Sequence, residues 1–301
     1  MQNYPGPAQT LVDSMRAEAR AAPDLAVAFQ GAPGAYSHQA VVESIADALP
    51  LPCYSFEETI DAVIDGVAAR AVIPVENSLH GRVADVHFLL PESGLYITGE
   101  HYVKVEHCLL GVPGAKLSDV REALSHAQAL GQCRHRLKEM RIRAVGFVDT
   151  SAAAAHVMEK GDPTVAAIAS KLAGELFGCE SLVTGLQDAS HNRTRFLILS
   201  RLPGTRPVDV PVKTTLAFET KNIPAALYKA LGGFATNGLN LTRLESHLRG
   251  GAFTAAEFLI DVIGAPEDPP VARALEELAF HSRWVRVLGV YPKAEIGNEA
   301  D

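Results

Sequence analysis

The polar cluster Asn192-Arg193-Thr194-Arg195-Phe196 carries the side chains of this sequence that are best suited to chemistry. It precedes an apolar, strand-like stretch, and strand alternation places Thr194 and Phe196 on one face and the arginines on the other. A guanidinium can bind a carboxylate through two parallel hydrogen bonds, and a threonine hydroxyl can donate to a departing oxygen. Such a segment more often forms an exposed edge strand whose arginines are solvated. The cluster favours a carboxylate site but does not establish one.

A second polar set ends the apolar segment Ile73-Pro74-Val75 and reads Glu76-Asn77-Ser78. In a cleft that binds carboxylates, desolvation and like charge would raise the pKa of Glu76, which would suit an acid. Glu76 could equally hold backbone donors, and Asn77 or Ser78 could simply cap a helix. The sequence leaves these alternatives open.

The stretch Ser125-His126-Ala127-Gln128 opens a predicted helix, where His126 is either a proton shuttle or an ordinary cap. The eleven histidines show no HExxH pattern and no paired ligand spacing, so we expect no metal site. Gly31-Ala-Pro-Gly34 lacks both the GxGxxG fingerprint and a GK[ST] ending, which argues against dinucleotide or ATP binding.

These polar sets belong to a pattern that recurs four times, in which a strand-like segment runs into a small or hydroxyl-bearing turn that opens a helix. Free N–H groups and the positive end of the helix dipole make each such start attractive to anions. In an open α/β sheet, such starts gather at the carboxyl ends of the strands, where ligands bind. The pattern predicts a small, multiply charged acid as the ligand. The four turns are 31–37, 76–78, 149–151 and 169–170.

Strand and helix signals alternate from residue 25 to about 201, which predicts an α/β fold with a parallel sheet and helices on both faces. Ser125, Ser151 and Ser170 are the expected N-caps. Residues 1–24 are expected to form an extension with a short helix over 9–21. The other helices are expected at 37–48, 55–65, 81–90, 125–140, 151–159 and 170–176.

The pattern changes after a linker at 202–207, which contains two prolines and a glycine. The order that follows is βαββαβ, which is the ferredoxin-like arrangement. The predicted strands are 213–220, 239–248, 252–262 and 284–291, with a turn at 249–251 and helices at 225–236 and 270–280.

Composition limits the partners of the chain. Its 301 residues are enough for about two domains, and 27 basic against 35 acidic residues give a net charge of −8. Without a basic stripe, this balance argues against nucleic acid and anionic membranes. The N-terminal segment lacks the apolar region of a secretory signal, and no apolar run approaches a membrane span. The four separated cysteines (Cys53, Cys108, Cys133 and Cys179) predict reduced thiols in a cytoplasmic protein.

Taken together, the motifs resemble those of prephenate dehydratases in order and spacing, over roughly residues 25–292. The C-terminal Leu241-Thr-Arg-Leu-Glu-Ser246 resembles the ACT regulatory domain that follows the catalytic part in that family. The motifs of the catalytic part are Gly31-x-x-Gly34-x-Tyr36-Ser37, Pro74-Val75-Glu76-Asn77-Ser78, His107-Cys108-Leu109-Leu110, Ser125-His126-x-Gln128-Ala129-Leu130, Asp149-Thr150 and Thr194-Arg195-Phe196.

The resemblance implies a catalytic region over 25–205 with two α/β lobes, similar to a periplasmic-binding-protein fold, then an ACT domain over 212–292 and a tail over 293–301. Prephenate would bind between the lobes and lose water and carbon dioxide to give phenylpyruvate, in phenylalanine biosynthesis, without cofactor or metal. Thr194 carries over as the catalytic donor at the ring hydroxyl. The implied substrate contacts are Arg195, Phe196, Asn77, Ser78, Ser37, Thr150, Ser125, Glu76 and Gln128.

The same resemblance implies feedback by L-phenylalanine at an ACT pocket and a homodimer or homotetramer. The chain departs from the family there, because Ala225 stands where glycine is usual and His247-Leu248 where Arg-Pro is usual. An added Cβ narrows the approach to the backbone, and a lost arginine removes a fixed charge. We expect regulation through an altered pocket. Its implied residues are Asn222, Ala225, Ala226, Leu227, Glu245 and Ser246.

Two other functions compete with this one. Arogenate dehydratase performs the same chemistry on an amino acid in place of the keto acid, and a non-catalytic two-lobed sensor would bind a carboxylate or an amino acid without turnover. The missing secretory signal and the Thr194-Arg195-Phe196 cluster favour an enzyme. A fused chorismate mutase is not expected, because residues 1–23 are too few for its helical domain.

Overall fold

The computed structural model describes residues 4–206, 209–248 and 256–296. Its contacts divide the chain into two compact units, one formed by the chain up to Val83 with His101–Phe196, the other by Ala84–Glu100 with Leu197–Ile296. The chain passes between the units inside β5 (Tyr96–Lys104) and β11 (Arg193–Ser200). No described helix is long and apolar enough to cross a membrane.

The first sheet is built around β1 (Ala26–Gln30), which pairs in parallel with both β2 (Leu49–Cys53) and β3 (Arg70–Asn77). The strand order is β2-β1-β3-β11-β5, and the short β4 (Gly81–Arg82) pairs with the end of β3. Since β1 is a central strand, nearly all of its side chains are buried. Its companion helices are α1 (Gly6–Ala21), α2 (Tyr36–Ser44) and α3 (Phe56–Ile64).

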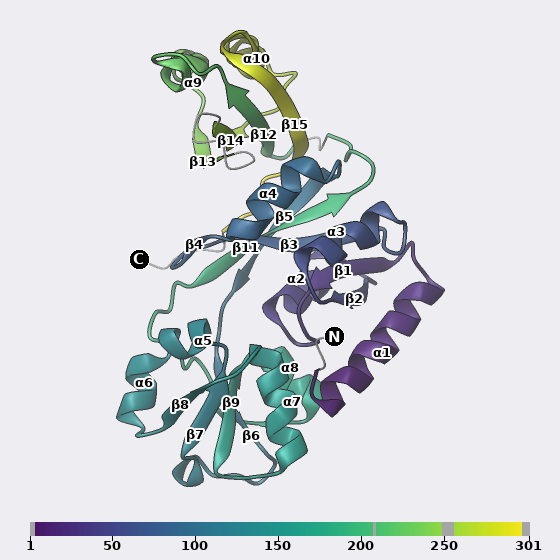
Figure 1. Ribbon diagram of the computed structural model, residues 1–301, viewed down its shortest axis with the longest axis vertical. Helices are drawn as coiled ribbons and strands as arrows, with labels where there is room; N and C mark the ends of the chain where they lie inside the picture. The colour runs from purple at the N-terminus through teal and green to yellow at the C-terminus, as the bar shows by residue number, and fades with distance from the viewer. Residues whose placement is uncertain (1–3, 207–208, 249–255, 297–301) are drawn as a thin grey trace. The chain divides into compact units, whose positions relative to one another are not determined.

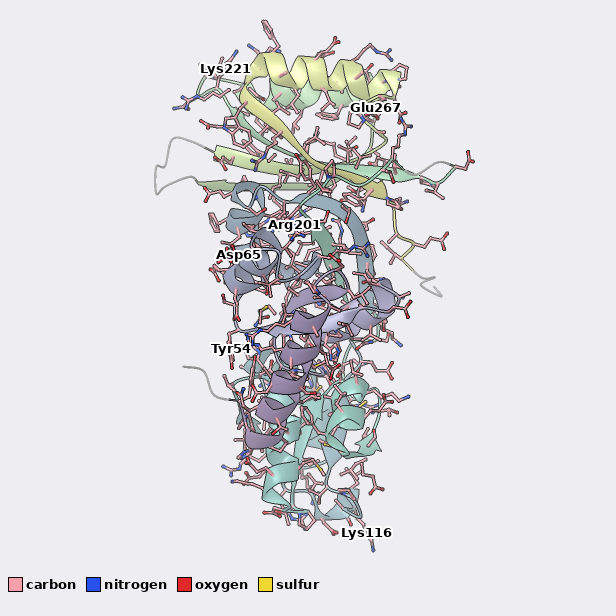
Figure 2. All side chains as sticks on the ribbon, turned by 90° about the vertical axis from the view of Figure 1, so that its right-hand side faces the viewer. Tyr54, Asp65, Lys116, Arg201, Lys221 and Glu267 are labelled. Carbon is pink, nitrogen blue, oxygen red and sulfur yellow. The ribbon has the colours of Figure 1, made fainter. Side chains whose placement is uncertain are left out.

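The N-terminal helix α1 is a packed element rather than the loose extension expected from its polar composition. Ala8, Val12 and Ala19 form a fully buried stripe at helical spacing. On its flank, the Arg16 guanidinium lies 4.8 Å from the ring centroid of Tyr54, which Figure 2 labels beside this helix, and 2.8 Å from a Glu58 oxygen. The small alanine and valine side chains, which give a weak sequence signal, allow this helix to pack closely against the rest of the unit.

The second sheet of the first unit has the order β10-β6-β9-β7-β8 and is mixed, not parallel throughout as predicted. β7 (Glu122–Ser125) runs parallel to β8 (Arg143–Gly146) and β9 (Val165–Ala169), whereas β6 (Cys108–Gly111) is antiparallel to β9 and to β10 (Glu180–Val183). An apolar layer covers each of its faces, and Figure 1 shows its helices beside the strands. One face packs against α7 (Thr150–Lys160) and α8 (Lys171–Phe177), the other against α5 (Ala127–Gln132) and α6 (Arg134–Glu139), and a short 3-10 turn (η1) spans Leu117–Asp119.

Two of the three predicted N-caps are wrong for the helices that pack on this sheet. Ser170 caps α8 as expected, accepting from Ala173 N at 3.0 Å. Asp149 caps α7 instead of Ser151, and His126 caps α5 instead of Ser125. Both serines point inward to carbonyl oxygens of distant segments, which a local capping pattern cannot anticipate. The single helix predicted over 125–140 is two helices that meet at Cys133, a buried residue with φ −112° and ψ 13°.

The second unit contains the predicted βαββαβ order, in which α9 and α10 pack together on one face of a four-stranded sheet (Figure 1). Its strand order, β13-β14-β12-β15, is antiparallel throughout. The core holds Leu216, Phe218, Phe234, Ile260 and Leu278. The predicted turn at 249–251 lies outside the described residues. The bounds are β12 (Val212–Thr220), α9 (Ala226–Thr236), β13 (Leu241–Leu248), β14 (Ala256–Ile263), α10 (Pro269–His281) and β15 (Ser282–Pro292).

One side chain joins the segment after β12 to the end of α10. Lys221, labelled near one end of α10 in Figure 2, donates from Nζ to the Phe280 carbonyl at 2.6 Å. The unit also includes α4 (Ala84–Glu92), whose place in the chain is directly after β4, and the first part of β5. Helix α4 thus follows closely after Asn77, which ends β3 in the first unit, but belongs to the second unit.

Candidate active site

A cavity of about 370 Å³ lies within the first unit, with a lining drawn from both of its sheets. It collects the ends of β1 and β3, the starts of α2, α5 and α7, and the start of β11, as expected for the carboxyl ends of α/β strands. The lining residues are Gln30, Gly31, Ala35, Tyr36, Ser37, Pro74, Asn77, Val83, Val105, His107, His126, Gln128, Ala129, Gln132, Val148, Asp149, Thr150, Thr194 and Phe196.

Three of the four predicted strand-to-helix turns contribute to this lining, and the fourth supports them. Ser170, at the fourth turn, donates from Oγ to the Gly34 carbonyl at 2.5 Å and so holds the turn before α2. Gly34 has φ +88°, and a Cβ there would lie 2.6 Å from the Ala173 backbone, so only glycine fits. The Ser151 hydroxyl also donates to this turn, at the Pro33 carbonyl.

Thr194 and Asn77 form the polar centre of the cavity. The Asn77 amide nitrogen donates to Thr194 Oγ1 at 3.0 Å and to Asn192 Oδ1 at 2.7 Å. Its oxygen accepts from the backbone N–H groups of Leu79 and His80, each at 3.0 Å. These bonds fix the orientation of the carboxamide. Since Thr194 Oγ1 accepts from Asn77, the hydroxyl proton remains available to donate to a group in the cavity.

Arg195 and Glu76 lie apart from the cavity lining. The guanidinium is 2% exposed and lies 2.9 Å from a Glu76 carboxylate oxygen. This follows from strand alternation, because Thr194 and Phe196 face the cavity and Arg195, between them, faces away. The ion pair therefore joins β3 to β11 and positions Thr194 indirectly.

Two predicted serine contacts have their hydroxyls engaged elsewhere. Ser78 Oγ donates to the His191 carbonyl at 3.1 Å and accepts from Arg193 N at 3.0 Å, joining its loop to β11. Ser125 is fully buried and donates to the Ile168 carbonyl at 2.6 Å. Neither residue lines the cavity, whereas the predicted Ser37, Thr150 and Gln128 do.

Tyr36, His107 and Gln132 are among the lining residues that were not assigned a role from the sequence. The Tyr36 hydroxyl lies 2.8 Å from His107 Nδ1, and His107 Nε2 lies 2.6 Å from Gln132 Oε1. Burial lowers the pKa of His107, so its ring is neutral, and these partners suit a proton on Nε2. Gln132 lies one helical turn after Gln128, and that spacing was the sequence signal that both amides share a face.

His80 extends this chain of polar contacts back to Asn77. Its Nδ1 lies 3.2 Å from Gln132 Nε2 and 3.2 Å from Asn77 Oδ1. The network thus runs from Tyr36 of α2 through His107, just before β6, and Gln132 of α5 to the loop after Asn77. It connects the two sheets of the first unit across the cavity.

The electrostatic character of the cavity is unusual for an acid-binding site. Within the described lining there is no lysine or arginine, so anion binding depends on backbone N–H groups, hydroxyls and amides. Asp149 is the one lining carboxylate. Burial raises its pKa, partly offset by N–H donors of Ala152 and Ser151 and by the nearby His126. In the described part of the chain, no group of three or more His, Cys, Asp or Glu side chains is arranged to hold a metal ion.

Comparison with known proteins agrees with this architecture. The family model for prephenate dehydratase matches residues 27–203. A Komagataeibacter europaeus protein named bifunctional N-acyl-homoserine lactone acylase/prephenate dehydratase is 52% identical over 267 residues, covering 88% of this chain and 95% of its own. Arogenate dehydratase/prephenate dehydratase 1 of Arabidopsis thaliana is 37% identical, covering 88% and 71%. The Arthrobacter aurescens prephenate dehydratase crystallised with L-Phe is 32% identical with a TM-score of 0.81, over 89% and 90% of the chains.

Proposed function

Because the chain belongs to the prephenate dehydratase family, we propose that it converts prephenate to phenylpyruvate, with loss of water and carbon dioxide. The observation that carries this proposal is the Thr194 hydroxyl, oriented by Asn77 at 3.0 Å and lining a cavity of about 370 Å³. The wall is apolar beside it, where Phe196 is 1% exposed. A polar donor next to an apolar wall suits a reaction in which a carboxylate and a hydroxyl leave one ring.

In the proposed reaction, the bond between the ring and its carboxylate breaks, and the electron pair moves into the ring. The C–O bond to the ring hydroxyl then breaks, and the departing oxygen takes up one proton to leave as water. Aromatisation of the ring drives the step. The protein contributes position, a dry environment for the departing carboxylate, and a donor at the departing oxygen.

Thr194 would act here as a hydrogen-bond donor and not as the final source of the proton. An aliphatic hydroxyl is too weak an acid to release its proton near neutral pH, but a fixed donor stabilises charge that develops on the leaving oxygen. The Asn77 amide makes this donation directional, since it occupies a lone pair of Thr194 Oγ1. Ser37, Thr150 and Gln128 are the proposed contacts for the two substrate carboxylates.

We also propose regulation by L-phenylalanine at the second unit, as the Arthrobacter relative crystallised with L-Phe suggests. Asn222 lies in the loop before α9, Ala225 is the N-cap of that helix, Ala226 and Leu227 begin it, and Glu245 and Ser246 belong to β13. Ala225 has φ +61°, a left-handed conformation that glycine adopts without strain, so the backbone geometry usual for glycine is retained with an alanine. A homodimer or homotetramer in the cytoplasm remains our expectation, and the four thiols are unpaired.

The test is turnover of prephenate by the purified protein, followed as phenylpyruvate, with Thr194→Ala and Thr194→Ser beside the wild type. We expect Thr194→Ala to lower kcat about 10²-fold and Thr194→Ser to keep much of the activity, because serine retains a hydroxyl. Thr236→Ala, on the exposed part of α9, serves as the matched control. Near-normal turnover by folded Thr194→Ala would remove Thr194 from the mechanism.

Arogenate and an N-acyl-homoserine lactone belong in the same assay. The Komagataeibacter relative carries an acylase name, but the structure offers no support for acyl transfer here. Across the described chain, no histidine hydrogen bonds to the cavity hydroxyls of Ser37, Thr150 or Thr194, so none resembles an activated nucleophile. A folded wild-type protein that turned over neither prephenate nor arogenate would favour a binding-only sensor.

A further inference from the structure

We propose that the second unit binds an α-amino acid with a cationic side chain, such as arginine, in a cavity of about 330 Å³ beside the end of α4. The cavity shares no lining residue with the candidate active site or with the expected L-phenylalanine pocket. The inference therefore does not depend on the proposed function. The lining residues are Pro91, Glu92, Glu257, Trp284 and Arg286.

The cavity lies on the face of the C-terminal sheet that points away from α9 and α10. Alternate residues of β12, β14 and β15 enter the apolar core under those helices, so the residues between them face the opposite side. On that side, Glu257 of β14 and Trp284 of β15 flank Glu219 of β12 in one row across the three strands. Arg286 follows Trp284 by two residues and therefore faces the same side. The C-terminal end of α4 completes the lining.

The indole ring of Trp284 is held in place by a buried carboxylate. Glu219 is 6% exposed, and its two oxygens accept from Trp284 Nε1 at 3.0 Å and from Arg283 Nη1 at 2.7 Å. These bonds fix the ring, whose face attracts a cation through its π electrons. Glu257, which is 5% exposed, adds a carboxylate to the same lining, and a carboxylate has enough acceptor positions to bind a ligand as well as a protein partner. An indole face and a carboxylate together favour a cationic side chain over an apolar one.

Two exposed side chains of opposite charge suit the head group of an α-amino acid. Glu92 ends α4 and Arg286 lies on β15, and within residues 4–206, 209–248 and 256–296 neither forms a hydrogen bond or an ion pair. Arg286 can bind an α-carboxylate and Glu92 an α-ammonium. With Glu257, the lining offers two carboxylates and one guanidinium. This set complements the two cationic groups and the single carboxylate of arginine or lysine.

The test uses the fluorescence of Trp284, which is the one tryptophan of the chain and lines the cavity. The full-length protein is titrated with L-arginine, with L-citrulline, which has a neutral urea in place of the guanidinium, and with agmatine, which lacks the α-carboxylate. We expect a saturable change with L-arginine. L-Citrulline should bind about tenfold more weakly, because it loses a charged hydrogen bond to the buried Glu257. Agmatine should bind about threefold more weakly, because its missing partner, Arg286, is exposed to solvent.

Two substitutions test the contacts of the head group. Arg286→Gln and Glu92→Gln should each raise the Kd of L-arginine about threefold, since both side chains are exposed. Arg286→Gln should not weaken the binding of agmatine, which has no carboxylate to lose. Glu276→Gln is the matched control, because it removes an exposed charge from α10, which packs on the opposite face of the sheet. It should leave the Kd of L-arginine unchanged.

Each outcome of the titrations supports or overturns the site. A saturable signal with this order of ligands, weakened by both substitutions and not by Glu276→Gln, supports it. A signal that does not saturate, or that the Glu92→Gln/Arg286→Gln double variant retains with the same Kd, would overturn it. Equal binding of L-citrulline would overturn the cationic class of the ligand, as would tighter binding of L-phenylalanine that both substitutions weaken.

Discussion

Replacing His87 by leucine should destabilise the second unit, because this ring contacts both a buried arginine and a partly buried glutamate. His87 is 2% exposed on α4, with Nε2 2.8 Å from Glu245 Oε2 and Nδ1 3.0 Å from Arg243 Nη2. A neutral ring can donate from Nε2 to the carboxylate and accept from the guanidinium at Nδ1. Among the residues that the structure describes, Arg243 Nη1 is buried without a hydrogen bond, so loss of His87 would leave this guanidinium with still fewer partners. Leucine fills the space but leaves both charges less well paired.

The magnitude follows from the burial of the three groups. A hydrogen bond from a neutral partner to a buried charged group contributes about 1.5–3 kcal/mol. Arg243 and Glu245 would still contact each other at 3.3 Å, and the Glu245 side chain is 18% exposed, which reduces the loss. We therefore expect His87→Leu to lower the free energy of unfolding by about 2 kcal/mol. The measurement is urea denaturation followed by far-ultraviolet circular dichroism.

A second histidine in the chain provides the control. His101 lies 2.8 Å from Glu43, with side chains 26% and 40% exposed. His101→Leu should therefore cost no more than about 0.5 kcal/mol, as expected of a solvent-exposed pair. If His87→Leu cost no more than His101→Leu, the reasoning that burial makes the His87 cluster important would be refuted.

The pH dependence of the unfolding free energy of His87→Leu tests the contribution of the Glu245 charge. Burial acts to raise the pKa of Glu245, but the His87 hydrogen bond and the Arg243 charge outweigh it and leave the pKa below the ordinary 4.5. A carboxyl whose folded pKa is lowered stabilises the fold above its unfolded pKa, and this contribution disappears as pH falls through the folded pKa. The difference in stability between wild type and His87→Leu should thus be full at neutral pH and shrink below about pH 4.5.

Two further substitutions test individual assignments. Ser125→Ala should lower the unfolding free energy by about 1–2 kcal/mol through loss of a buried hydrogen bond, with KM unchanged, and a tenfold rise in KM would instead place the hydroxyl in contact with substrate. Ala225→Gly should raise the unfolding free energy by about 0.5–1 kcal/mol, because it removes left-handed strain at φ +61°. Isothermal titration would show whether it also strengthens L-phenylalanine binding, and unchanged stability would contradict the strain argument.

Much of the fold was predictable because its signals are local. The βαββαβ order of the second unit follows from apolar periodicity and turn residues, and the structure confirms it from Val212 to Pro292. The strand alternation that separates Thr194 from Arg195 is equally local, and Arg195 lies outside the cavity as that alternation requires. The mixed direction of the second sheet was missed, because strand order and direction depend on which segments pair and not on the composition of any one of them.

By itself, the sequence determined the types of polar residue that end the strands, the order of the elements and the family. The use of each polar side chain was decided by the tertiary structure. Ser125 and Ile168 are 43 residues apart, and Asn77 and Thr194 are 117 apart, yet each pair is joined by a hydrogen bond. Packing between segments that are distant in the chain decides which hydroxyls face the cavity. It also decides which hydroxyls instead donate to buried carbonyl oxygens. A buried polar group must find a partner wherever the fold provides one.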